Sequence, residues 1–183
     1  YTSVFAGGRM LHPVNPTIKG FYKIPSREEV AEILKRLENT REDVEETVKL
    51  WATFKLPHYT RETEYISLRS REEFALYDGE IYSSVKGTIP VADYRSVTNE
   101  FVVPHSTSKR CKHTRASYQV GALARVNNNY DQLLPSARKA AERLGFRTPC
   151  HNPYHISTAQ IVELVHCWDN SIRMLKAMLD QYP

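Results

Sequence analysis

The chain has 183 residues, of which 41% are hydrophobic and 25% are charged, a balance that suits one globular domain with a buried core. Ten Pro with only seven Gly exclude a collagen-like chain, and no apolar run approaches the roughly 20 residues that span a bilayer. The 25 basic and 21 acidic residues leave a net charge of +4, well short of what a dedicated nucleic-acid-binding protein carries.

The cysteines and the start of the chain bear on its cellular context. The chain has three cysteines, Cys111, Cys150 and Cys167. Because their number is odd, their spacing is wide and no two form a CxxC motif, they do not indicate a disulfide framework. A reducing compartment is therefore expected. The chain begins at Tyr1, and residues 1–5 lack the basic start and apolar stretch of a signal peptide. We expect it to be a section from the middle of a longer protein.

The first third of the chain predicts a loop followed by helix. Residues 1–20 are rich in Gly and X-Pro pairs and favour an ordered loop, with a short strand at 21–24. Ser26 and Glu29 form a capping box that opens a helix. Two apolar stripes with helical spacing then predict either one long helix or a broken pair: Val30, Ile33, Leu34 and Leu37, followed by Val44, Val48, Trp51 and Phe54.

The middle third, residues 59–120, is predicted to be a β-rich region. Asp78-Gly79 separates two short apolar-aromatic runs, 74–77 and 80–83, which is the pattern of a hairpin with a type I′ turn. Further strands are expected at 65–68, 88–91, 101–103 and 117–120.

The last third returns to helical periodicity. An Ala- and Arg-rich segment at 136–144 ends at Gly145, and apolar residues keep helical spacing from 157 to 179. There is no βαβ repeat, so the predicted class is α+β, with long helices at both ends packed around a small antiparallel β unit that contains the hairpin. We expect residues 1–183 to form a single domain.

Two clusters could carry chemistry, and each has a structural alternative. The first cluster consists of five His and Cys side chains that could bind a metal: Cys150, His151, His155, His166 and Cys167. Neighbouring residues such as Cys150 and His151 point in different directions, and Pro153 disfavours a helix that would bring His151 and His155 onto one face. A metal site is therefore the weaker interpretation of this cluster. Residues 109–115 contain four basic side chains that could contact a phosphate backbone, although a solvated loop or a protein contact fits a mildly basic chain better. No nucleophile elbow or P-loop accompanies either cluster.

Several segments carry uncommon residues in a fixed order. They lie at 7–14, 20–29, 75–84, 89–91 and 100–127, and the most specific is the string Val-Gly-Ala-Leu-Ala-Arg-Val-Asn at 120–127. Together they resemble the large subunits of nickel–iron hydrogenases, in particular the soluble, cofactor-linked branch with sulfhydrogenase-type alpha subunits. The resemblance runs from Phe5 to about Leu179.

The resemblance implies a metal centre that this sequence does not itself complete. In the family, two CxxC motifs supply four thiolates to nickel and iron, and a Pro-Arg segment would follow residue 183; this chain has no CxxC. It therefore resembles the central portion of a large subunit, with no metal, cofactor or catalytic residue of its own, and is expected to be inactive alone. A degenerate homologue that has lost its metal is the alternative, and the start at Tyr1 favours a middle section.

The resemblance also implies a setting for the parent protein. The parent would oxidise H2 or reduce protons at a nickel–iron centre. Electrons would pass through iron–sulfur clusters in a small subunit and electron-transfer subunits to a soluble carrier. We expect a cytoplasmic protein without a membrane or nucleic-acid partner. A metal-free hydrogenase-like module that docks a partner subunit is the alternative function.

The same resemblance nominates particular side chains. Arg125 is expected to be structural, packing the 120–125 turn against neighbouring helices. Five residues match segments near the surroundings of the metal centre, where side chains position ligands or relay protons: His12, Glu100, His105, Ser106 and Lys109.

Overall fold

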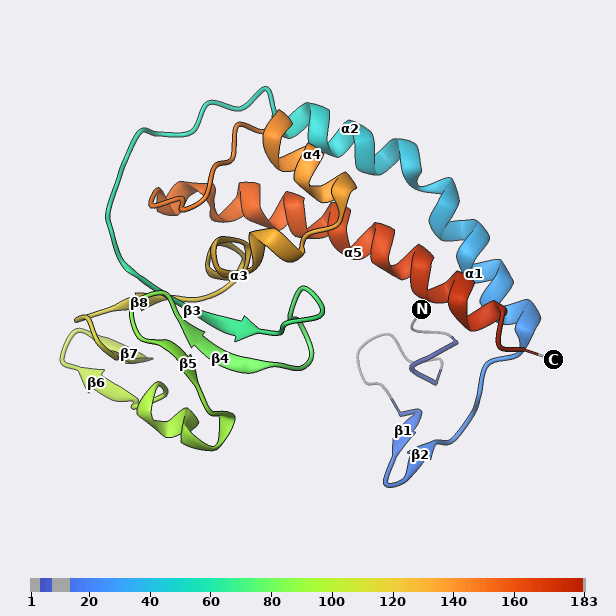
Figure 1. Ribbon diagram of the computed structural model, residues 1–183, viewed down its shortest axis with the longest axis horizontal. Helices are drawn as coiled ribbons and strands as arrows, with labels where there is room; N and C mark the ends of the chain where they lie inside the picture. Colours follow the sequence, from blue (N-terminus) through green and yellow to red (C-terminus); the bar gives the residue numbers. More distant parts are fainter. Residues whose placement is uncertain (1–3, 8–13, 183) are drawn as a thin grey trace. The chain divides into compact units, whose positions relative to one another are not determined.

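The structure is a computed structural model that describes residues 4–7 and 14–182 (Figure 1). His12 lies outside the described residues. The structure confirms the predicted α+β class. The chain divides into two compact units, here called the terminal unit (Tyr1–Glu46 with Cys167–Pro183) and the central unit (Thr47–His166). Two helices, α2 (Arg41–Trp51) and α5 (Ile156–Leu179), have residues in both units.

The terminal unit is built on α1 (Arg27–Asn39), which starts as the capping box predicts. The Ser26 hydroxyl accepts from the Glu29 N–H at 3.2 Å, and the Glu29 carboxylate accepts from the Ser26 N–H at 2.9 Å. Val30 and Ile33 form a buried cluster with Leu175 of α5. Helix α1 ends at Asn39 and α2 begins at Arg41, so the broken pair of helices is the form observed.

A small antiparallel ladder precedes α1 in the terminal unit. It pairs β1 (Pro16–Thr17) with β2 (Gly20–Phe21), so the strand expected at 21–24 is shorter and starts earlier. The buried Asn15 side chain fixes this segment, because its amide donates to the Lys23 carbonyl at 2.8 Å and its oxygen accepts from the Lys23 N–H at 2.6 Å.

The main sheet of the central unit has the strand order β5-β4-β3-β8. Its strands are β3 (Glu64–Arg69), β4 (Glu80–Ser83), β5 (Gly87–Ile89) and β8 (Tyr118–Gln119). The first three pair antiparallel, whereas β8 runs parallel to β3, so the sheet is mixed rather than purely antiparallel.

The predicted hairpin between 74–77 and 80–83 is wrong. Strand β4 pairs with β3, with Ile66 opposite Ser83, and its hairpin partner is β5. Residues 74–77 form no strand, and β3 and β5 occupy both edges of β4, so no edge remains for residues 74–77 to pair with. Gly79 instead lets the chain pass close to β3: a Cβ there would lie 2.7 Å from the Arg69 carbonyl oxygen.

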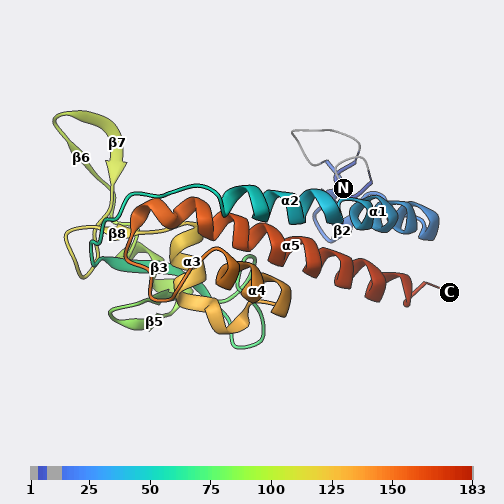
Figure 2. The ribbon, with the colours of Figure 1, turned by 90° about the horizontal axis from the view of Figure 1, so that it is seen from above.

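The remaining β structure is a separate hairpin. It joins β6 (Phe101–Val103) to β7 (Ser106–Arg110) and extends away from the main sheet of the central unit (Figure 2). A 3-10 helix, Val91–Ser96, precedes it. Strands β3 to β8 therefore all fall within the region predicted to be β-rich.

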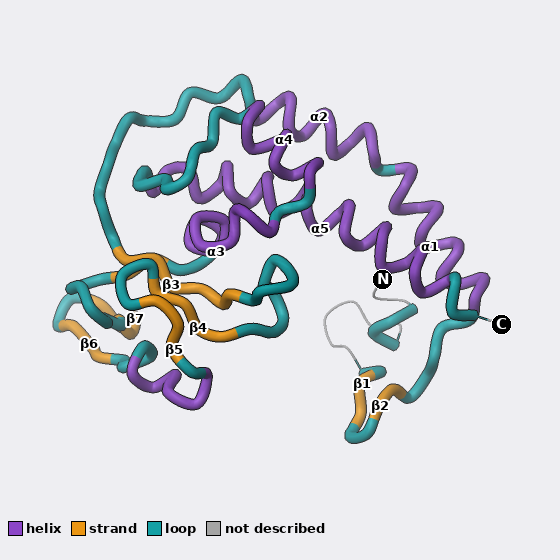
Figure 3. The backbone as a smooth tube through the Cα atoms, in the orientation of Figure 1, coloured by secondary structure: helices purple, strands orange, loops and turns teal. Residues whose placement is uncertain are grey.

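Helices complete the central unit. The secondary-structure colouring in Figure 3 separates the strands from α3 (Ala122–Asn129), α4 (Pro135–Arg143) and the first half of α5. Helix α3 packs on β3 and buries Leu123, Ala124 and Val126 completely. The helices predicted at 136–144 and 157–179 are confirmed as α4 and α5. In the described part of the chain, no helix is long and apolar enough to cross a membrane.

Candidate functional site

Four of the residues nominated by sequence lie together on one hairpin. Glu100 precedes β6, His105 occupies the turn, and Ser106 and Lys109 belong to β7. The Lys109 ammonium is 2.7 Å from the Glu100 carboxylate, and this hydrogen bond raises the pKa of Lys109. Both side chains are more than half exposed, as an ion pair in water would be. Their assignment to a proton path stays a prediction.

The central unit also contains a buried carboxylate that sequence reasoning did not nominate. Glu64 is completely buried at the start of β3. Its Oε1 accepts from the Ser83 hydroxyl at 2.6 Å and lies 2.6 Å from His113 Nδ1. Its Oε2 accepts from the backbone N–H groups of Thr114, at 3.0 Å, and Arg115, at 3.3 Å. One carboxylate therefore ties β3, β4 and the segment after β7 together.

The surroundings of Glu64 keep it ionised. Burial raises the pKa of this carboxyl, but the hydrogen bonds from Ser83, His113 and the Arg115 backbone lower it, and the net pKa is below its ordinary value. The sequence did hold a signal: Glu64 alternates with Ile66 and Leu68, so strand periodicity places it on the same face as these apolar residues.

Arg125, in the string that most specifically carried the resemblance, joins α3 to α5. The backbone turns at Gly121, with a φ of 83°, to start α3. The Arg125 guanidinium then donates to both carboxylate oxygens of Glu163, at 2.6 and 2.8 Å. This geometry is compatible with the structural role expected of Arg125, which stays a prediction.

Three consecutive asparagines, residues 127–129, end helix α3 and form hydrogen bonds to other segments of the central unit. Asn127 donates to the Cys150 carbonyl at 2.9 Å and accepts from the Cys150 N–H at 2.8 Å. Asn128 donates to the Ser67 hydroxyl at 2.9 Å, and Asn129 donates to the Leu68 carbonyl at 3.0 Å. Sequence reasoning named Arg125 but missed these amides, because their partners lie far away in the sequence.

The candidate metal ligands occupy separate local environments. His151 stacks on Tyr65, with 5.7 Å between ring centroids, and His155 Nδ1 lies 3.2 Å from the Thr158 hydroxyl. His166 Nδ1 accepts from the Leu134 N–H at 3.2 Å. Burial raises the pKa of the Cys150 thiol, which disfavours the thiolate that metals bind. Among residues 4–7 and 14–182, no three His, Cys, Asp or Glu side chains are placed to hold a metal ion. The donors described therefore do not fit a nickel–iron centre.

Two of the four Lys and Arg side chains in the basic cluster at 109–115 pair with carboxylates. Lys109 pairs with Glu100 and His113 contacts Glu64, as above. Arg115 pairs with Glu62 at 2.6 Å. Lys112 lies over the Phe101 ring, 5.9 Å from its centroid. These contacts favour a folded loop over a phosphate-binding surface.

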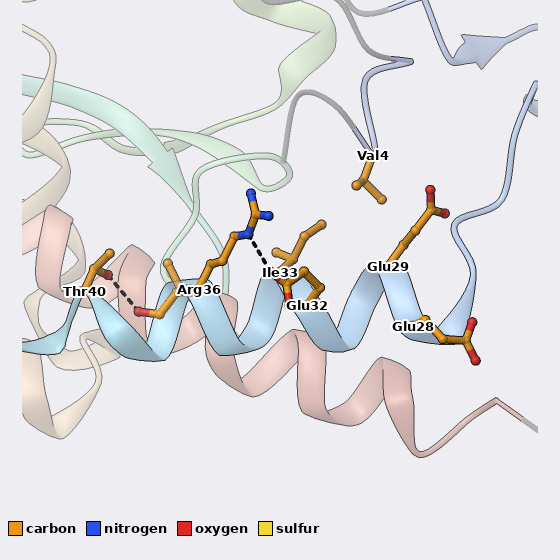
Figure 4. Close-up of a pocket in the computed structure, with 8 residues that line it drawn as sticks. Val4, Glu28, Glu29, Glu32, Ile33, Arg36 and Thr40 are labelled. Carbon is orange, nitrogen blue, oxygen red and sulfur yellow. Dashed lines mark hydrogen bonds and ion pairs between the residues drawn. The ribbon is translucent and has the colours of Figure 1, made fainter.

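Cavities occur in both units. The terminal unit has one of about 480 Å³ along α1, where Arg36 and Glu32 are hydrogen-bonded at 2.8 Å (Figure 4). Glu28 and Glu29 also line it, and Glu29 pairs with Lys23. The central unit has cavities of about 300 Å³ beside Tyr65, 350 Å³ on the sheet and 430 Å³ near the start of α5.

Comparison with known proteins tests the resemblance to nickel–iron hydrogenases. No family model matches the chain. Sulfhydrogenase 1 subunit alpha of Pyrococcus furiosus is 29% identical over 182 residues, which cover 97% of this chain and 42% of that protein. A chain in the crystal structure of an NAD+-reducing nickel–iron hydrogenase, in its H2-reduced state, superposes with a TM-score of 0.70 and 25% identity. The resemblance to nickel–iron hydrogenase large subunits is confirmed.

The likeness covers nearly all of this chain but less than half of each known protein. The superposition covers 98% of this chain but 45% of the hydrogenase chain. This chain thus spans less than half the length of each of these two proteins, and it is hydrogenase-like across nearly all of its own length.

Proposed function

We propose that this chain is the central, metal-free portion of a nickel–iron hydrogenase large subunit, and that it has no hydrogenase activity alone. The observation that carries the proposal is the likeness over 97% of the chain to a sulfhydrogenase alpha subunit, together with the superposition on a hydrogenase chain. The parent reaction would be oxidation of H2 or reduction of protons.

The role of the chain in that parent is to build the frame around the metal centre. The Arg125–Glu163 pair and Asn127 join α3 to α5 and to the 150 loop, while the buried Glu64 joins the sheet strands. The nickel–iron centre would be held by thiolates outside this chain. The iron–sulfur clusters would belong to a small subunit, with electron-transfer subunits beyond it, in a cytoplasmic complex.

The exposed β6–β7 hairpin is the part of the frame proposed to approach the metal centre. Glu100, His105, Ser106 and Lys109 would there hydrogen-bond ligands or pass protons. His12 lies outside the described residues, and the same role is proposed for it from the resemblance alone. The proposal is supported by the placement of the first four on one projecting hairpin, and by the Lys109–Glu100 pair, which could reorganise around a partner.

Flanking sequence and activity test the proposal together. We expect the coding DNA on either side of this segment to encode one CxxC upstream and a second downstream, and the isolated chain to show no H2-dependent reduction of a viologen dye. A start codon just before Tyr1 with a stop codon just after Pro183 would contradict the first expectation. Dye reduction by the isolated chain would contradict the second.

A docking module is the second candidate function, because the terminal unit exposes apolar side chains on one segment. Ile18 is 95% exposed, Tyr22 88%, Ile24 75% and Phe21 66%. Such side chains are typical of a surface that another protein covers. Co-purification with a hydrogenase small subunit should be lost in Ile18→Ser/Tyr22→Ser, but kept in Tyr77→Ser, whose side chain is equally exposed in the central unit. Equal retention by all variants would contradict this candidate.

A further inference from the structure

The central unit contains a cavity of about 430 Å³ whose ionisable lining residues, as far as the structure describes them, are all Lys, Arg or His. It lies among the end of α2, the chain that follows it, the end of α4 and the start of α5. Lys55, His58, Arg143 and His155 line it, and none of the described residues that line it is Asp or Glu. This composition distinguishes it from the cavity beside Tyr65, where Glu62 is part of the lining.

Among the described residues, neither permanent cation of this cavity has a carboxylate partner, whereas some other cations of the chain do. In the described part of the chain, the side chains of Lys55 and Arg143 make no ion pair and no hydrogen bond. By contrast, Lys109 and Arg115 each lie within 2.7 Å of a carboxylate. Two unpaired cations in a concave, partly apolar site concentrate positive potential, which attracts a doubly charged anion.

A rigid aromatic wall faces the same space. The Trp51 indole N–H donates to the Thr158 hydroxyl at 3.0 Å, which fixes the ring, and Thr158 is 1% exposed. Phe54 meets Trp51 edge to face, with 5.2 Å between centroids and 84° between the rings. Phe54 remains half exposed, so a planar ligand could pack on it at little cost.

We propose that this cavity binds a small organic phosphate that carries a planar ring, with Lys55 and Arg143 on the phosphate and the ring against Trp51 and Phe54. A phosphate monoester has the charge that two cations match, and guanidinium is a preferred phosphate donor because it can give two parallel hydrogen bonds. The volume is within the range of small-molecule sites, about 300–1,000 Å³. The inference does not depend on the hydrogenase proposal, because it rests on residues of this cavity alone.

Calorimetric titration of the purified chain with three probes tests the site. Adenosine monophosphate should bind more tightly than either adenosine or inorganic phosphate, because only the ester uses both the cations and the aromatic wall. If inorganic phosphate binds as tightly as adenosine monophosphate, the proposed packing of the ligand's ring against Trp51 and Phe54 is wrong. Absence of binding by the ester would overturn the whole proposal.

Variants locate the binding in the cavity. Arg143→Ala and Lys55→Ala should each lower the affinity for adenosine monophosphate by about tenfold, the usual effect of removing a charged hydrogen bond. Both residues are exposed, so the variants should fold, which circular dichroism would verify. Lys139→Ala is the matched control, because Lys139 is an exposed cation one turn earlier on α4 and lines none of the cavities described above. An affinity unchanged in Arg143→Ala and Lys55→Ala, or lowered equally in the control, would overturn the assignment.

Discussion

The Arg125 guanidinium donates two parallel hydrogen bonds to the Glu163 carboxylate, at 2.6 and 2.8 Å, and so connects α3 to α5. Glu163 is nearly buried, whereas about a third of the Arg125 side chain is exposed. A pair in this setting is stronger than a surface ion pair, because water competes with it less.

Arg125→Lys should therefore destabilise the chain although it keeps the charge. An ammonium cannot reproduce the two parallel bonds, and we expect the free energy of unfolding to fall by about 1–3 kcal/mol. Urea denaturation followed by circular dichroism measures the change. Arg147→Lys is the control, because Arg147 is an exposed residue outside both helices. Equal stability of the two variants would contradict a structural role for Arg125.

Glu64→Gln should destabilise the central unit at neutral pH. The amide nitrogen would face donors that now bind a carboxylate oxygen, so we expect a loss of about 2 kcal/mol in the free energy of unfolding of a fully buried side chain. Glu73→Gln, at an exposed position, is the matched control and should behave like wild type.

The stability difference between wild type and Glu64→Gln should depend on pH. The folded pKa of Glu64 lies below its unfolded value, so its contribution is complete above the unfolded pKa of about 4.3 and is lost as the pH falls through the folded pKa. Urea titrations at a series of pH values from 7 downward should show the difference narrowing in acid. A difference that stays constant over this range would mean that Glu64 does not act as an ionised group.

Gly79→Ala should be more harmful than Gly87→Ala. Both glycines have positive φ, 141° and 81° respectively, so Ala strains the backbone at each, by about 1–2 kcal/mol. At Gly79 the new methyl group would also lie 2.7 Å from the Arg69 carbonyl oxygen, whereas nothing lies within 4 Å at Gly87. Thermal unfolding should give a lower midpoint for Gly79→Ala, and equal midpoints would contradict the close approach of the 79 turn to β3.

Lys109→Ala should separate function from stability. The Lys109–Glu100 pair is exposed, so its loss should leave the urea midpoint unchanged. In the assembled hydrogenase proposed above, the same variant should slow H2 oxidation. Lys86→Ala, an exposed cation outside the β6–β7 hairpin, should change neither quantity. Wild-type turnover by Lys109→Ala would remove this residue from the proposed proton path.

Local signals predicted the helices well and the strand pairing poorly. The Ser26–Glu29 capping box and the apolar spacing before Thr40 are complete within a few residues, so sequence alone locates α1. Strand pairing depends on partners elsewhere. Strand β4 pairs with β3 on one edge and β5 on the other, which leaves no edge for residues 74–77 of the predicted hairpin.

In the candidate site too, contacts between residues far apart in the sequence could not be predicted from local signals. Resemblance nominated Arg125, and its partner Glu163 lies 38 residues further along the chain. The Glu64 network was missed because its donors come from residues 83 and 113–115, and an isolated acid at the start of a strand resembles a solvated one. Asn128 and Asn129 reach back more than 60 residues to β3, which no local pattern could reveal.

Nickel and iron content tests the central claim most directly. The chain would be produced in a host that assembles nickel–iron hydrogenases, purified without its flanking sequence, and analysed by inductively coupled plasma mass spectrometry. We predict no nickel above the trace level of a Cys111→Ser/Cys150→Ser/Cys167→Ser control. One nickel per chain, lost in that control, would show that this chain holds the metal itself and would contradict its assignment as the metal-free frame.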